Sequence, residues 1–202
     1  MGIGILAYGS LIEMPGKELG PLVQQPPTGP VKTPFRVEFA RKSVSTRGGA
    51  PTLTPVETGG AFVNGVIWVL DDMLSIEDAK DKLWRRETGN ECNDKHYDPD
   101  NPGSVIIKSL NEFGGLETVL YAYTKPNIDE LTPENLAYLA IESARGDAGA
   151  KQPPKDGISY LISIKEHGIV TPLMPAYEAA ILNRTKASSL PEAFVKVRRG
   201  EA

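Results

Sequence analysis

The chain has 202 residues, 40% of them hydrophobic and 24% charged, the ordinary composition of a globular protein built on one core. Its formal net charge of −4 is too small to indicate a nucleic acid or an anionic membrane surface as partner. No apolar run approaches the roughly 20 residues that a membrane span needs, and the apolar start, residues 1–7, lacks the basic region of a signal peptide. We expect a single domain over residues 1–202, a cytoplasmic location, and no nucleic-acid or membrane partner.

Cysteine and histidine are scarce, and this limits the catalytic chemistry. Cys92 is the one cysteine, so the chain forms no internal disulfide. Cys92 and His96 have a spacing that a nucleophile and its base could use, but their polar, Asn- and Asp-rich surroundings favour an incidental loop. With His167 as the other histidine, there are too few ligands for a zinc-type cluster. We therefore expect no metal and no cofactor.

The first half of the chain is predicted to consist of short strands joined by turns. An apolar run at 3–8 reads as a strand and stops at a glycine turn. Residues 14–34 contain six prolines and are predicted to be a meandering connection with little helix. Alternating or β-branched segments then predict further strands, at 36–40, 52–56 and 62–70.

A helix is predicted to follow these strands. Apolar residues recur at helical spacing through 75–87, and Ser75 can cap the start, with Asp78 in the position of a capping box. Residues 88–104 are polar and rich in Gly, Pro, Asn and Asp, which indicates an ordered loop or a mobile lid.

The remainder is predicted to be a hairpin followed by helices. The predicted strands are 105–110 and 117–123; the predicted helices begin at Thr132-Pro133, at 157 and near 175. The basic tail, residues 196–199, is predicted to be a solvated end. Strands first and helices last, with one helix among the strands, indicate an α+β fold.

Two short groups of residues suit chemistry, although each also has an ordinary structural explanation. Tyr8-Gly9-Ser10-Leu11 follows the first strand, and a glycine there lets consecutive backbone N–H groups point together at an anion or a carbonyl oxygen. By itself this string is an ordinary turn. Glu87 ends the predicted helix, where an ion pair with Lys82, Arg85 or Arg86 would explain it. Neighbouring residues on a helix point in different directions, so the two arginines need not face a site at Glu87.

The order of these motifs resembles the γ-glutamylcyclotransferase-like family, also called the AIG2-like or ChaC-like group. The resemblance covers roughly residues 3–185. It rests on the following stretches: Tyr8-Gly9-Ser10-Leu11; residues 49–56, Gly-Ala-Pro-Thr-Leu-Thr-Pro-Val; residues 64–70, Asn-Gly-Val-Ile-Trp-Val-Leu; residues 83–88, Leu-Trp-Arg-Arg-Glu-Thr; residues 144–149; and residues 157–161. The last two look like the helical tail of the ChaC-like branch. Thr88-Gly89-Asn90 after the glutamate, and the long polar loop beyond it, depart from the usual pattern.

The resemblance implies a closed mixed β-barrel flanked by helices, with a helical C-terminal part and a cavity at one end. It implies that Tyr8, Gly9, Ser10 and Leu11 bind the substrate through backbone amides, and that Glu87 is the catalytic acid/base. In some members a tyrosine downstream of the glutamate reaches the substrate. Tyr97 is the candidate for that role, with a solvated loop tyrosine as the alternative.

The implied reaction releases 5-oxoproline from a γ-glutamyl amide when the substrate's own α-amine attacks its γ-carbonyl. Nucleophile and electrophile are already tethered, so positioning supplies most of the acceleration, and one carboxyl group can carry the proton from one nitrogen to the other. The expected partner is a small γ-glutamyl molecule; the leaving amine and the oligomeric state are open. The alternatives are a non-catalytic small-molecule-binding or regulatory module on the same barrel, and an unrelated α+β domain with coincidental motifs.

Overall fold

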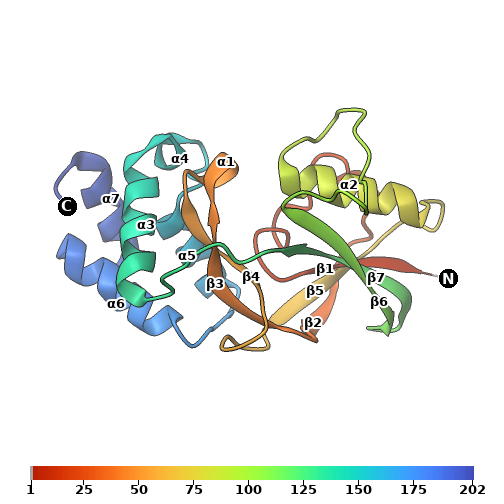
Figure 1. Ribbon diagram of the computed structural model, residues 1–202, viewed down its shortest axis with the longest axis horizontal. Coiled ribbons are helices and arrows are strands. Elements are labelled where there is room, and N and C mark those ends of the chain that lie inside the picture. Colours follow the sequence, from red (N-terminus) through yellow and green to blue (C-terminus); the bar gives the residue numbers. More distant parts are fainter. Residues whose placement is uncertain (1) are drawn as a thin grey trace. The chain divides into compact units, whose positions relative to one another are not determined.

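The computed structural model describes residues 2–202, and the packing of its backbone divides them into two compact units (Figure 1). Unit 1 comprises the residues up to Pro34 together with Asn64–Lys125, and unit 2 comprises Phe35–Val63 together with Pro126–Ala202. Each unit is therefore made from two separate stretches of chain. That the whole chain forms a single domain stays a prediction.

Unit 1 is built on a five-stranded mixed sheet. Its strands are β1 (Ile3–Ala7), β2 (Thr28–Lys32), β5 (Asn64–Val69), β6 (Val105–Phe113) and β7 (Leu116–Thr124), arranged in the order β2-β5-β1-β7-β6. The β1–β7 pair is parallel and the other pairs are antiparallel. Figure 1 shows β1 in the middle of this sheet, so the segment that leaves its carboxyl end emerges at the centre of unit 1.

The sheet is open, and the expectation of a closed barrel is wrong. β2 and β6 are its two edges and do not pair with each other. β2 is a poor partner for another strand because Pro30 lacks a backbone donor and because its register against β5 shifts between Thr28 and Val31. The proline-rich connection thus contains this edge strand and a short 3-10 turn, η1 (Gly20–Leu22), which the sequence pattern does not predict.

Helix α2 (Ile76–Thr88) covers one face of this sheet. Its residues Ala79 and Leu83 are fully buried in the core of unit 1, which β1, β5, β6 and β7 also supply. The predicted N-cap is confirmed, because Ser75 Oγ accepts the backbone N–H of Asp78 at 3.1 Å. The helix ends at Gly89, which takes a left-handed conformation. Residues next to each end of the helix thus determine where it begins and ends, and this places Glu87 in its last turn.

Unit 2 combines a two-stranded sheet with helices. Its elements are β3 (Arg36–Ser43), α1 (Val44–Arg47), β4 (Ala50–Val56), α3 (Pro133–Arg145), α4 (Asp147–Ala150), α5 (Gly157–Glu166), α6 (Met174–Thr185) and α7 (Leu190–Arg199). Phe39 packs edge-on against Tyr160 and Tyr177 in its core. The carboxylate of buried Glu38 accepts the N–H of Phe39 at 2.9 Å and the hydroxyl of Thr171 at 2.5 Å. The predicted α+β class is confirmed.

The basic tail is exposed at Arg198 and Arg199, as predicted for a solvated end, but it is helical. Residues 196–199 belong to α7, whose Leu190, Ala193 and Val197 are buried. The guanidinium of Arg198 donates to three carbonyl oxygens at the end of α3, those of Ala144, Arg145 and Gly146. A cation at a helix C-terminus satisfies carbonyl groups that have no intrahelical partner. Within residues 2–202, no helix is long and apolar enough to cross a membrane.

Candidate functional site

The segment after β1 forms a single helical turn. The backbone N–H groups at the start of this turn have no hydrogen-bond partner within it. Ile12 N–H donates to Gly9 O at 2.9 Å and Met14 N–H to Ser10 O at 3.1 Å. The first N–H groups of a helical turn have no partner within it. Across residues 2–202, no hydrogen bond is formed by the N–H groups of Gly9, Ser10 or Leu11. Three consecutive donors are thus available to an anion or a carbonyl oxygen.

The side chains at both ends of this turn anchor it to the sheet. The hydroxyl of Tyr8 donates to the carbonyl oxygen of Ala122 on β7 at 2.5 Å. Leu11 is buried in the core of unit 1, and its carbonyl oxygen accepts the indole N–H of Trp68 at 3.1 Å. Of the four residues predicted to bind substrate, Tyr8 and Leu11 therefore hold the backbone in place, while Gly9 and Ser10 lie between these anchors.

Glu87 lies beside this turn, and Arg86 joins the two. Arg86 Nη1 donates to Glu87 Oε1 at 2.5 Å, and Arg86 Nη2 donates to Ser10 Oγ at 3.3 Å. The same guanidinium donates twice to Met14 O, from Nη2 at 2.8 Å and from Nε at 3.2 Å. The side chain of Glu87 remains 21% exposed, against 11% for Arg86. A partly accessible carboxylate and a loop with free amides are therefore connected through one half-buried cation.

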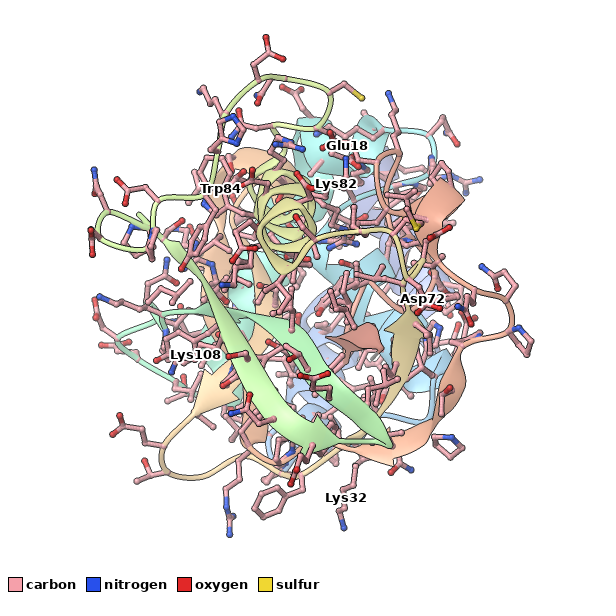
Figure 2. The ribbon with its side chains drawn as sticks, turned by 90° about the vertical axis from the view of Figure 1, so that its right-hand side faces the viewer. Glu18, Lys32, Asp72, Lys82, Trp84 and Lys108 are labelled. Carbon is pink, nitrogen blue, oxygen red and sulfur yellow. The ribbon has the colours of Figure 1, made fainter. Side chains whose placement is uncertain are left out.

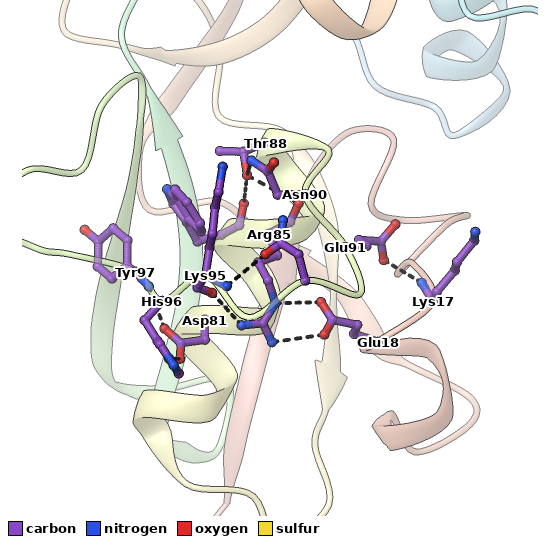
Figure 3. A network of polar contacts seen from close by, with 12 residues as sticks. Lys17, Glu18, Asp81, Arg85, Thr88, Asn90, Glu91, Lys95, His96 and Tyr97 are labelled. Carbon is purple, nitrogen blue, oxygen red and sulfur yellow. Dashed lines mark hydrogen bonds and ion pairs between the residues drawn. The ribbon is translucent and has the colours of Figure 1, made fainter.

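The preceding residue holds the same segment at a second point. Arg85 Nε and Nη2 donate to the two carboxylate oxygens of Glu18 at 2.9 and 3.0 Å, and Nη1 donates to Lys95 O at 2.8 Å (Figure 3). The Arg85 hydrogen bond holds the pKa of Glu18 below its usual range. Nearby, Glu91 Oε1 accepts the backbone N–H of Lys17 at 2.6 Å. We call residues 9–18 the clasped loop, because Arg85, Arg86 and Glu91 hold it against the end of α2.

Asp81, one turn before Arg85 on α2, also holds the polar segment 88–104. Asp81 accepts the backbone N–H of Tyr97 at 2.7 Å, and its second oxygen lies 2.5 Å from Nδ1 of His96 (Figure 3). Burial acts to raise the pKa of Asp81, but these two hydrogen bonds outweigh it, and the pKa lies below its usual range. Figure 2 shows that Lys82 and Trp84 leave the helix in opposite directions and that Glu18 lies on the Lys82 side.

Tyr97 has a structural position. Its ring packs against the core of unit 1, and its hydroxyl accepts the backbone N–H of Ile107 on the edge strand β6 at 3.1 Å. Within the described chain, no hydrogen bond joins Tyr97 to residues 8–11 or to Glu87. The structure therefore brings Glu87 and the glycine turn together but gives Tyr97 a different set of contacts.

Cys92 is exposed, and His96 forms its ion pair with Asp81. In the described residues no hydrogen bond connects this cysteine with His96, and no group of three or more His, Cys, Asp or Glu side chains could hold a metal ion. The ion pair between Arg86 and Glu87 is one of those that the sequence suggested, whereas the contacts of Arg86 with Met14 and Ser10 were missed. The only signal for these contacts was the place of Arg86 between a helix C-terminus and an acidic neighbour, which an ordinary ion pair explains equally well.

Comparisons with known proteins add a distant similarity. No family model and no curated protein matches the chain. Among solved structures, the chain is similar to a γ-glutamyl cyclotransferase specific to glutathione from yeast, with 14% sequence identity, a TM-score of 0.49 and coverage of 100% of both chains. Because a likeness of this size establishes neither family nor reaction, the function has to be argued from the residues of the chain itself.

Proposed function

We propose that the chain is a γ-glutamyl cyclotransferase whose site comprises the amides of residues 9–11 and the carboxylate of Glu87. The observation that carries the proposal is the bridge through Arg86, which joins this carboxylate to a turn whose three backbone donors have no partner in residues 2–202. The substrate is a small molecule with a γ-glutamyl group. Its α-amino acid head bears a carboxylate, which suits backbone donors, and an ammonium group, which suits Glu87.

In the proposed reaction, the α-ammonium group first gives a proton to Glu87. The free amine then attacks the γ-carbonyl carbon, the new C–N bond closes the five-membered ring, and the bond to the departing nitrogen breaks. Glu87 returns its proton to that nitrogen, and the second proton of the attacking nitrogen also passes to the leaving group, which departs as an ammonium ion. The products are 5-oxoproline and a free amine, and no water is consumed. Since attacking and attacked atoms belong to one molecule, the protein's main task is to hold the chain folded, for which effective molarities of roughly 10⁵–10⁸ M are known.

The first prediction concerns Glu87. Purified protein is incubated with a panel of γ-glutamyl amino acids, γ-glutamyl amines and γ-glutamyl peptides, and 5-oxoproline is measured by mass spectrometry. We expect release from at least one member and a loss of about 10²–10⁴-fold in kcat for Glu87→Gln, the usual contribution of a positioned acid/base. Glu77→Gln on the first turn of the same helix is the matched control, because Glu77 is largely exposed, and it should retain wild-type turnover.

The alternative is a module that binds γ-glutamyl compounds without converting them. One observation favours it: in this structure the carboxylate of Glu87 already has a cationic partner at 2.5 Å. Binding of panel members by calorimetry, with no 5-oxoproline formed, would support this alternative. Glu87→Gln turning over as fast as the wild-type protein would reject the assigned mechanism.

A further inference from the structure

We propose that Arg86 is a positioning residue, which holds the carboxylate of Glu87 at a fixed place relative to the amides of residues 9–11. The inference rests on the proposed function, since it assigns Glu87 its task. It concerns how the proton-transferring group is aimed, and it gives Arg86 no direct contact with the reacting atoms.

The anchor of Arg86 is the backbone of the clasped loop. Two of its nitrogens converge on Met14 O, at 2.8 and 3.2 Å, so the guanidinium plane is fixed by a fork on one acceptor. The third nitrogen, Nη1, is then aimed at Glu87. A planar group bound in this way transmits the position of the loop to the carboxylate, because its nitrogens cannot move independently of one another.

The surroundings keep Arg86 in this arrangement. Its side chain is 11% exposed, and Gly16 lies directly against it: a Cβ on Gly16 would come within 2.8 Å of Arg86 Cγ and 2.3 Å of Glu91 Oε1. Gly16 also has a φ of +95°, a conformation that residues with a side chain rarely adopt. The loop can therefore close onto Arg86 only because residue 16 is a glycine.

Glu87 needs such a partner more than most surface carboxylates do. It lies in the last turn of α2, where the partial negative charge of the helix C-terminus disfavours an anion. Glutamate also has three rotatable side-chain bonds, and a partly exposed one would otherwise sample several rotamers. Misplacement of a catalytic group by about 1 Å can slow a reaction about 10²-fold. The proposed chemistry therefore requires that the side chain of Glu87 be held in one rotamer.

The first test does not depend on turnover. Crystal structures of the wild-type protein and of Arg86→Met are compared at Glu87, with Arg85→Lys as the matched control. Arg85 holds the same loop through Glu18 but makes no described hydrogen bond to Glu87. We expect the Glu87 carboxylate to leave its place or become disordered in Arg86→Met and to stay in place in Arg85→Lys. An unmoved carboxylate in Arg86→Met overturns the proposal whether or not the protein is an enzyme.

The second test uses turnover of whichever γ-glutamyl compound the wild-type protein converts. We expect Arg86→Met to lower kcat about 10–100-fold with KM changed less than about threefold, and Arg85→Lys, which keeps the contact between Arg86 and Glu87, to lower kcat clearly less. Methylguanidinium added to Arg86→Ala should restore part of kcat without raising the unfolding temperature, which a purely structural role would not produce. Equal kinetic losses in the Arg85 and Arg86 variants would contradict the positioning role of Arg86.

The two tests distinguish this inference from the proposed function. If the wild-type protein converts no panel member, the proposed function fails, and the crystallographic comparison still decides the role of Arg86. If Arg86→Met does not fold, Arg86→Lys takes its place in both tests.

Discussion

Two consecutive arginines divide the work at the end of α2. Arg85 binds both carboxylate oxygens of Glu18 and is 7% exposed, so it acts as a structural anchor. Arg86 contacts the loop and the candidate acid/base together. Successive helical side chains normally diverge, yet both reach the clasped loop, because a guanidinium on a long stem can bend around the helix end. Neither role could be predicted from the sequence, because basic residues are common in the last turn of a helix.

The ion pair between Arg85 and Glu18 leads to a prediction about pH. The pKa of Glu18 is lowered in the folded protein, so the pair stabilises the fold above the ordinary glutamate pKa, and this stabilisation is lost as pH falls through the lowered value. At pH 7, Glu18→Gln should reduce the free energy of unfolding by about 1–3 kcal/mol, because buried Arg85 loses its charged partner. Urea unfolding of both proteins from pH 7 down to pH 3 measures the difference, which should shrink toward the acid end.

The control for this prediction is again Glu77→Gln. Glu77 forms a 4.0 Å pair with Lys80 and is 81% exposed, so its replacement should change the free energy of unfolding by less than about 1 kcal/mol. A Glu18→Gln effect that is as small as this, or one that does not vary with pH, would contradict the assigned role of the pair.

At the scale of elements, local signals predicted most of the helices and strands. Ser75 at the start of α2 and Thr132 at the start of α3 both accept the expected backbone N–H group, because a cap is a contact between residues three apart and is written in the sequence. Closure of the sheet could not be predicted in this way. Whether the edges β2 and β6 meet depends on pairing between distant strands, and in the sequence Pro30 of β2 indicates only a loop.

The candidate site shows the same division between local and distant contacts. The turn after β1 and the position of Glu87 were both predictable, the first from Gly9 and the second from the resemblance of the motif order. The contacts through which Arg86 joins this turn to Glu87 could not be predicted, because Arg86 and Ser10 are 76 positions apart in the sequence. For Tyr97 the family resemblance suggested a ligand contact, which stays a prediction; in the structure its hydroxyl accepts an N–H of the edge strand β6, a common need at sheet edges.

The clasped loop gives a prediction at the element scale. Gly16→Ala should reduce the free energy of unfolding by more than the roughly 1–2 kcal/mol that a left-handed conformation costs a residue with a Cβ, because the new methyl group displaces Glu91 and Arg86. It should also lower kcat, since Arg86 must shift. Gly103→Ala is the matched control: Gly103 has a φ of +65° and nothing within 4 Å of its added Cβ. Equal losses of stability in the two variants would argue against close packing at Gly16.

At the scale of the whole molecule, the chain has a single thiol and that thiol is exposed. We expect one equivalent of Ellman's reagent to react with the native protein, and Cys92→Ser to keep wild-type release of 5-oxoproline. His96→Gln tests the partner of the nucleophile–base pair considered for Cys92 and should also leave kcat unchanged, because its contact is with Asp81. A large loss of kcat in either variant would restore a thiolate mechanism.

The two-segment construction of unit 1 has a consequence for how the protein is made. The clasped loop belongs to the first segment, whereas Arg85, Arg86 and Glu91 belong to the second, which follows an excursion of the chain through Phe35–Val63. On a ribosome adding about 5–20 residues per second, Ser10 precedes its partner Arg86 by 76 positions and waits roughly 4–15 s for it. During that interval the nascent loop carries unpaired amides and no clasp, so the site cannot assemble until Glu91 has been made, which happens before half of the chain has been synthesised.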